Sequence, residues 1–225
     1  MAVADDSRAL VSGATAPAIR RGQYLIDGAL YPRVSSILAV INKPFLATWR
    51  GKVGNTEADR IAREATDLGT RVHAVCAAAL GGPPCDDDDP ALRPYATAVQ
   101  AWAARDVATV LACERVVISR RHRYAGTCDL LCRLQDGALA LVDFKTSKQL
   151  DPVYGVQLAA YRRALWEEGL TPQRRLVLWL PKAQPGAWEL ATYPAHARDD
   201  RVWLAALALW RWQHPDVPAT PHTHE

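Results

Sequence analysis

The sequence predicts a single mixed α/β domain in which helices flank a small central β-sheet. Its length of 225 residues suits one domain that buries its own core. Hydrophobic residues make up 49% of the chain and charged residues 23%, which is ordinary for a folded soluble protein. Helical spacing dominates the first part of the chain, and a β-β-β-α-β order with a closing helix follows. Such an order favours a sheet with helices packed on it.

The domain is expected to span residues 23–214. Residues 1–22 are small and polar without a period, so we expect a flexible lead-in there, and residues 215–225 are expected to be a flexible tail. Within the domain, residues 24–28 favour a short strand and turn. Residues 31–38 favour an extended segment that leads into a short helix.

Helical patterns fill most of the next seventy residues. Apolar side chains at helical spacing predict a helix over residues 56–68, which Gly69 would end in a left-handed conformation. Thr70 is expected to cap a second helix that runs to about Leu80. A further helix is predicted over residues 94–106.

The second half of the chain has the composition of strands. A hairpin turn at residues 135–137 is expected to join two of them, because Gln-Asp-Gly separates two apolar runs there. The expected strands cover residues 114–119, 123–134, 138–146, 175–180 and 188–193, and the expected helices cover 153–166 and 195–213.

Charge and cysteine content exclude several classes of protein. The net charge of +3 is too small to indicate nucleic-acid binding, so a basic surface would have to come from local clusters, at Arg120, Arg121 and Arg123 and at Arg162, Arg163, Arg174 and Arg175. The five scattered cysteines are best explained as reduced thiols, which argues against a structural zinc site. Neither a signal peptide nor a membrane-spanning run is visible, so a cytoplasmic location is expected.

The most informative stretch carries two carboxylates and a lysine on neighbouring predicted strands. Asp129 follows Gly126, and Asp143 and Lys145 lie on the strand beyond the hairpin turn. Side chains alternate along a strand, so Asp143 and Lys145 point to one side while Phe144 points into the core and offers only its carbonyl. Carboxylates and carbonyls are the ligands that Mg²⁺ or Mn²⁺ prefers. The stretch therefore predicts a divalent-cation site with an ammonium group beside it.

Further side chains could complete this site. Lys145 is expected to stay protonated beside two carboxylates, and so to orient water and stabilise a transition state. Gln157 and Tyr161 are four residues apart on one helix face, from which they could hold the site's geometry or a DNA phosphate. His73 is an additional candidate ligand through a neutral imidazole, which would suit manganese better than magnesium.

These motifs resemble the PD-(D/E)xK nuclease superfamily, in its RecB-like and phage-exonuclease-like branch. The resemblance covers roughly residues 31–165, in the order Gly69 to His73, Glu114, Gly126 to Asp129, Asp143 to Ser147, and Gln157 to Tyr161. It implies a restriction-endonuclease-like core, metal ligation by His73, Asp129, Asp143 and the Phe144 carbonyl, catalysis by Lys145, support from Gln157 and Tyr161, and a place near the site for Glu114. No proline precedes Asp129, and an aspartate, Asp143, takes the place of the glutamate. The absence of cysteine after Cys132 disfavours the subtype with an iron–sulfur cluster.

Plainer explanations exist for each residue taken alone. An Asp-x-Lys sequence at a strand end is commonly a solvated edge, and Glu114 could be a strand-edge charge. Tyr161 could pack in the core with Tyr154. Trp210 and Trp212 could stack on bases, although most tryptophans belong to cores.

The function expected from the whole pattern is a metal-dependent DNA nuclease. An exonuclease that acts on single-stranded DNA or duplex ends in recombination, repair or phage replication fits best, with a recombination or replication protein as partner. Two alternatives stay open, namely a catalytically inactive nucleic-acid-binding module with the same fold and a different metal-dependent hydrolase. The oligomeric state stays open as well.

Overall fold

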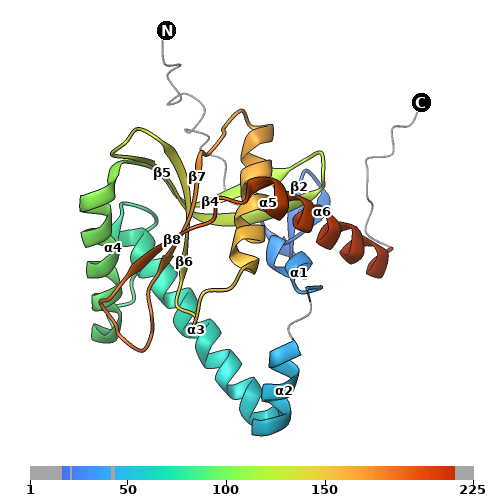
Figure 1. Ribbon diagram of the computed structural model, residues 1–225, viewed down its shortest axis with the longest axis horizontal. Helices are drawn as coiled ribbons and strands as arrows, with labels where there is room; N and C mark the ends of the chain where they lie inside the picture. The colour runs from blue at the N-terminus through green and yellow to red at the C-terminus, as the bar shows by residue number, and fades with distance from the viewer. Residues whose placement is uncertain (1–16, 21, 42–43, 216–225) are drawn as a thin grey trace.

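A computed structural model describes residues 17–20, 22–41 and 44–215 of the chain. Most of the expected lead-in and nearly all of the expected tail lie outside the described residues. The centre of the structure is a five-stranded sheet in the order β4-β5-β6-β7-β8 (Figure 1). Its strands are β4 (Val107–Ser119), β5 (Tyr124–Leu134), β6 (Leu139–Lys145), β7 (Arg174–Trp179) and β8 (Glu189–Thr192).

The sheet is mixed, as expected. Neighbouring strands pair antiparallel except for β6 and β7, which pair parallel. The parallel pair requires a crossover, and α5 (Val153–Glu167) provides it. The turn at residues 135–137 joins β5 to β6, and the positive φ of 82° at Gly137 explains why glycine occupies that turn.

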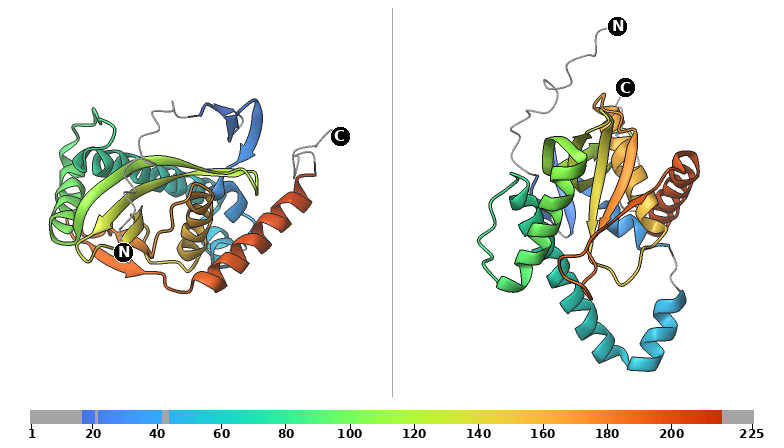
Figure 2. Two further views of the ribbon diagram at one scale, coloured as in Figure 1. Left: turned by 90° about the horizontal axis from the view of Figure 1, so that it is seen from above. Right: turned by 60° about the vertical axis from the view of Figure 1, so that its left-hand side comes forward.

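Helices cover both faces of the sheet (Figure 2). On one face, α1 (Val34–Leu38), α5 and α6 (His196–Gln213) contribute to an apolar cluster that includes Ile37, Leu158 and Trp203. On the other face, α3 (Asn55–Ala79) and α4 (Arg93–Asp106) contribute Val72 and Trp102 to a second cluster. The alternation along β6 divides it between the two cores, because every other side chain points to the opposite face.

A smaller antiparallel sheet lies beside β5. It consists of β1 (Ile19–Arg20), β2 (Gln23–Ile26) and β3 (Ala29–Pro32). Tyr24 and Tyr31 pair across its strands and pack with Ala125 of β5. The short helix η2 (Pro90–Leu92) precedes α4, while α2 (Pro44–Val53) and the start of α3 project away from the central sheet (Figure 1).

Two sequence-based expectations in the helical part were wrong. Residues 55–79 form one continuous helix, so Gly69 does not end a helix and Thr70 does not begin one. The Thr70 hydroxyl instead donates a hydrogen bond to the Thr66 carbonyl, 3.0 Å away within the helix. A glycine in a helix costs only about 1 kcal/mol relative to alanine. The packing of α3 against the sheet outweighs that cost.

The first strand of the sheet is also longer than expected. β4 begins at Val107, seven residues before the expected start at Glu114. Its pairing with β5 is irregular, with register shifts near Val107 and Val110. Glu114 has a φ of 49°, which is rare for a residue other than glycine and lies between the paired residues Cys113 and Arg115. Among the described residues, no helix is long and apolar enough to cross a bilayer.

Candidate active site

The two predicted aspartates lie where β5 and β6 separate. The last pair of the β5–β6 ladder at this end joins Leu130 to Val142, and Asp129 and Asp143 come next on each strand. The Phe144 backbone N–H donates a hydrogen bond to Asp129 Oδ2 over 2.6 Å. Asp129 is 5% exposed and Asp143 1% exposed, so both carboxylates are buried. The diverging strands thus bring two acids together inside the protein.

Helix α3 and strand β4 add a histidine and a third acid. His73 Nδ1 lies 3.3 Å from Asp129 Oδ1. One ligand atom from each of His73, Glu114 and Asp129 can be chosen so that all three lie within 4.8 Å of one another. Glu114 Oε1 is buried, and no described residue donates a hydrogen bond to it. An unsatisfied buried carboxylate oxygen is costly unless a cation or a water molecule meets it.

Lys145 and helix α5 support Asp143. The Lys145 ammonium pairs with Asp143 Oδ2 and lies 5.1 Å from the centre of the Tyr154 ring. The Gln157 amide donates to Asp143 Oδ1 over 2.9 Å and to the Tyr161 hydroxyl over 3.0 Å. The four-residue spacing therefore puts Gln157 against Asp143 and Tyr161 against Gln157.

Phe144 has the orientation that the sequence predicts. Its ring is fully buried with Val142 in the core on the α3 side of the sheet. The next carbonyl along the strand, that of Lys145, accepts from Leu180 N–H on the β7 side. Because backbone groups alternate sides along a strand, the Phe144 N–H and C=O both point to the β5 side, where Asp129 lies.

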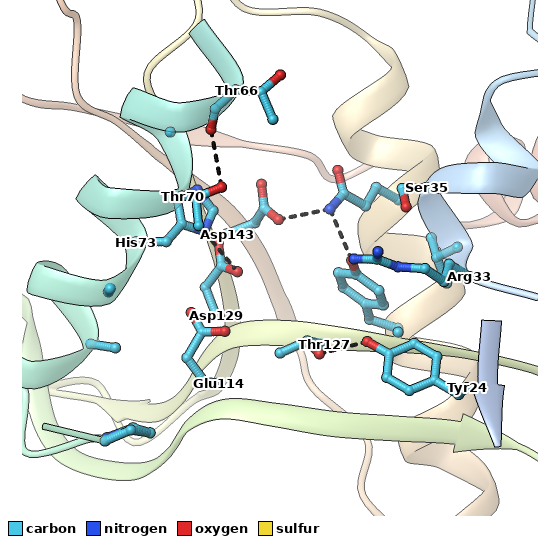
Figure 3. A pocket seen from close by; sticks show the side chains of 18 of the residues that line it. Tyr24, Arg33, Ser35, Thr66, Thr70, His73, Glu114, Thr127, Asp129 and Asp143 are labelled. Atoms are coloured by element: carbon cyan, nitrogen blue, oxygen red, sulfur yellow. Dashed lines mark hydrogen bonds and ion pairs between the residues drawn. The ribbon is translucent and has the colours of Figure 1, made fainter. Parts of the chain in front are cut away.

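A cavity of about 530 Å³ is lined by six of these residues, His73, Glu114, Asp129, Asp143, Gln157 and Tyr161. His73, Thr66 and Thr70 of α3 form one wall, and Arg33 and Ser35 of the β3–α1 segment form the opposite wall (Figure 3). Sequence reasoning assigned no role to Arg33, although it lies within the 31–38 segment that supported the resemblance. Its signal was a single arginine in an apolar stretch, which by itself is too common to indicate a site.

Gly126 allows the sheet to approach α5 closely. A Cβ atom at this position would lie 2.5 Å from Tyr161 Cε1 and 3.1 Å from Val34 Cγ2. Both neighbours are buried side chains of the core on the α5 side. Glycine at 126 therefore lets the Tyr161 ring reach the position from which its hydroxyl meets Gln157.

The carboxyl groups differ in how firmly they hold protons. Burial raises the pKa of Glu114 to about 7, and the neighbouring Asp129 charge adds to this rise. Burial also raises the pKa of Asp143 to about 6, although the Lys145 ammonium opposes the change. Burial acts on Asp129 in the same direction, but the His73 ring and the Lys145 ammonium outweigh it and lower its pKa. Asp129 is thus the most firmly ionised acid of the three.

The two basic groups are held in their charged forms by these acids. Burial disfavours the His73 imidazolium, but Asp129 outweighs burial and raises the pKa of His73 to about 9. Burial likewise disfavours the Lys145 ammonium, and the charges of Asp143 and Asp129 raise its pKa nonetheless. Lys145 is therefore protonated, as expected. Without a cation the raised pKa favours the imidazolium form of His73, whereas metal ligation requires the neutral imidazole.

The donor set fits a divalent cation. Three carboxylates, one imidazole and one backbone carbonyl combine hard oxygen ligands with a nitrogen that Mn²⁺ accepts readily. A bound cation would displace the proton from His73 and would meet the unsatisfied Glu114 oxygen. The structure thus brings together all the residues that the sequence singled out for the site, while their individual roles stay predictions.

Comparison with known proteins agrees with this geometry. A family model described as the PD-(D/E)XK nuclease superfamily matches residues 92–224, which is more than half of the chain. The match includes Glu114, Asp129, Asp143 and Lys145 and begins after His73. No curated protein matches the chain. A solved structure titled "Crystal structure of SSO0001" has a TM-score of 0.39 and 14% sequence identity over 79% of this chain and 75% of that one.

Proposed function

The chain belongs to the PD-(D/E)XK nuclease superfamily, and we propose that it is a metal-dependent DNA nuclease of the RecB-like and phage-exonuclease-like branch. The observation that carries this proposal is the convergence of Glu114, Asp129 and Asp143 in one cavity, with Lys145 paired to Asp143. Phosphodiester hydrolysis requires a nucleophilic water and a counterion for the charge that grows on the phosphate. This set of side chains can organise both.

The acidic side of the cavity would hold the cation. We assign ligation to His73, Asp129, Asp143 and the Phe144 carbonyl, with Glu114 close enough to His73 and Asp129 to contribute. When bound, Mg²⁺ or Mn²⁺ makes water nucleophilic near neutral pH and neutralises charge on the phosphate. Burial of Asp129 and Asp143 strengthens their attraction for the cation, because surrounding water screens them little.

Lys145 would act on the reacting phosphate. Its ammonium is held by Asp143 and lies above the Tyr154 ring, so it is charged and restricted in position. A fixed positive charge beside the cation can orient the attacking water and stabilise negative charge in the transition state. Gln157 fixes one oxygen of Asp143 and is fixed in turn by Tyr161, so these two residues position the acid.

The opposite wall of the cavity suits the DNA strand. Arg33 and Ser35 face the acids across the cavity, where a guanidinium and a hydroxyl can bind phosphate oxygens (Figure 3). The cavity is bounded on one side by α3 and on the other by the β3–α1 segment. Such a bounded site supports action on single strands or duplex ends, and hence an exonuclease in recombination, repair or phage replication that works with another protein of that process.

Cleavage of linear and covalently closed DNA in parallel tests the proposal. Purified protein with Mg²⁺ or Mn²⁺ is expected to degrade linear single-stranded or duplex DNA, to leave closed circles intact, and to stop when EDTA is added. Cutting of closed circles would reject the exonuclease assignment and keep the nuclease. No cleavage of any substrate with either metal would reject the nuclease itself.

A further inference from the structure

A second charged cluster lies at the other end of β5, away from the acids. The turn between β4 and β5 carries Arg121, His122 and Arg123. Arg163 of α5 approaches it, with Nη2 3.3 Å from His122 Nε2. Arg211 of α6 donates from Nη2 to the His122 carbonyl over 2.8 Å. Three elements therefore deliver four arginines to one place, which we call the turn cluster (Arg121, Arg123, Arg163 and Arg211).

The positive charge of the turn cluster is not neutralised within the described part of the chain. None of its four arginines has a carboxylate within ion-pair distance among the described residues. Glu167 acts electrostatically on His122, but its oxygens accept from the Ser119 hydroxyl at 2.5 Å and the Arg121 backbone N–H at 3.1 Å.

Several other arginines of the protein do have a carboxylate partner. Arg71, Arg115, Arg120 and Arg175 each have a carboxylate oxygen within 3.0 Å. The second basic cluster expected from the sequence is also dispersed, because Arg174 pairs with Asp136, Arg175 with Asp199, and Arg162 donates to the Pro172 carbonyl. Of that group only Arg163 joins the turn cluster.

Some polar atoms of the turn cluster also have no hydrogen-bond partner in the described part of the chain. Arg123 Nε and Arg163 Nε are buried and make no hydrogen bond there. Arg123 adopts a φ of 41°, which is uncommon for a side-chain-bearing residue, and its guanidinium lies 5.2 Å from the centre of the Tyr31 ring. Like charges held together without counterions cost free energy, and a bound anion would offset that cost.

We propose that the turn cluster binds the phosphate backbone of the nucleic acid at a distance from the bond that is cut. The identity of this polyanion rests on the proposed function. Arg123 precedes Asp129 by six positions along the chain, which is about 20 Å at about 3.3 Å per strand residue. A stacked strand advances about 3.4 Å per nucleotide, so the turn cluster would contact phosphates about six nucleotides from the acids.

The path between the two sites agrees with this proposal. Thr127 of β5 lines the cavity and contacts the Tyr24 hydroxyl at 2.8 Å. Tyr24 pairs across the small sheet with Tyr31, whose ring contacts the Arg123 guanidinium. Arg33 of the cavity wall bridges to Ala125, between Thr127 and Arg123 on β5. The small sheet therefore joins the cavity wall to the turn cluster.

Binding of a fluorescently labelled oligonucleotide, measured by anisotropy in EDTA so that no cleavage occurs, tests the inference. Arg121→Gln and Arg163→Gln are expected to weaken binding by about tenfold each, because each removes a charge-assisted phosphate interaction. The slope of log K against log salt should fall by about 0.7 for each phosphate of a single strand that the variant no longer neutralises. Arg201→Gln removes an exposed arginine elsewhere on α6 and serves as the control.

Each outcome decides a separate question. Binding by both cluster variants that matches the Arg201→Gln control, in affinity and in salt slope, would overturn the inference. Wild-type protein that binds anionic lipid vesicles but not the oligonucleotide would overturn it too. Arginine-dependent binding without cleavage in Mg²⁺ or Mn²⁺ would reject the proposed function and keep the inference. Since Arg121 is exposed, its variant should fold, which a thermal melt checks.

Discussion

Two buried ionic groups of this protein differ in how their positive and negative charges are matched. Arg175 and Asp199 form the first, in which the guanidinium donates to the Gly155 and Tyr193 carbonyls and to Asp199, all within 2.9 Å. This pair joins β7, α5 and α6 on one side of the sheet. Asp199 also pairs with Arg198 at 3.0 Å, so each buried charge of this group has an opposite charge beside it, although Arg175 Nε has no hydrogen-bond partner among the described residues.

The acids of the cavity form the second group, and their balance is different. The basic groups that lower the pKa values of Asp129 and Asp143 are His73 and Lys145, while Arg33 lies on the opposite wall of the cavity. Glu114 Oε1 has no hydrogen-bond partner among the described residues. Burial raises the pKa of both Glu114 and Asp143, which shows the cost of keeping these acids ionised without a cation. A buried charge with partners holds a fold together, whereas a buried charge without enough partners marks a place where something binds.

The largest effect should come from the cavity group. Asp143→Asn keeps the shape of the side chain and removes its charge, so cleavage of linear DNA should fall by about ten-thousandfold, or about 5.4 kcal/mol of transition-state stabilisation. Single-turnover rates with Mn²⁺ measure this. Asp136→Asn, in the exposed turn between β5 and β6, provides the matched control. A fall in the cleavage rate of less than tenfold in Asp143→Asn would contradict a catalytic role for the acids of the cavity.

The Arg175–Asp199 pair should instead control stability. Asp199→Ala leaves the Arg175 charge buried and unpaired, which should lower the free energy of unfolding by about 3 to 5 kcal/mol. Urea denaturation measures this. Asp59→Ala breaks an exposed ion pair with Arg50 and should cost at most about 1 kcal/mol. Equal losses in the two variants would show that the Arg175–Asp199 pair is no more structural than a surface pair.

A smaller effect tests the packing behind the cavity. Gly126→Ala should lower the free energy of unfolding by about 1 to 3 kcal/mol, because its Cβ would press on the Tyr161 ring. Gly69→Ala meets only Thr146 Oγ1 at 3.7 Å and lies within α3, so it should raise stability by up to about 1 kcal/mol. Thermal unfolding compares the two, and destabilisation by both variants would contradict the packing described for α3.

Local patterns in the sequence predicted much of the fold. Alternating side chains and the Gln-Asp-Gly turn were enough to place Asp129 and Asp143 on adjacent strands, because hairpin geometry depends on few residues. The end of a helix at Gly69 was wrong, since the contacts of α3 with the sheet override a local signal. The positive φ of Glu114 had no signal in the sequence.

Contacts between residues far apart in the sequence could not be predicted. Arg175 meets Asp199 across 24 positions, and the expected basic cluster at Arg174 and Arg175 gave no sign of that pairing. The approach of Arg211 to His122 spans 89 positions and depends on how α6 packs. Such contacts follow from the tertiary arrangement, which a single sequence specifies only as a whole.

Calorimetric titration of the protein with Mn²⁺ tests the central claim most directly. The wild-type protein should bind the cation, and Asp129→Asn should lose that binding, because Asp129 contacts both His73 and the Phe144 backbone at the centre of the donor set. Asp136→Asn should bind as the wild type does. Mn²⁺ binding of equal affinity in the wild type and in Asp129→Asn would contradict the claim that these buried acids form a metal centre.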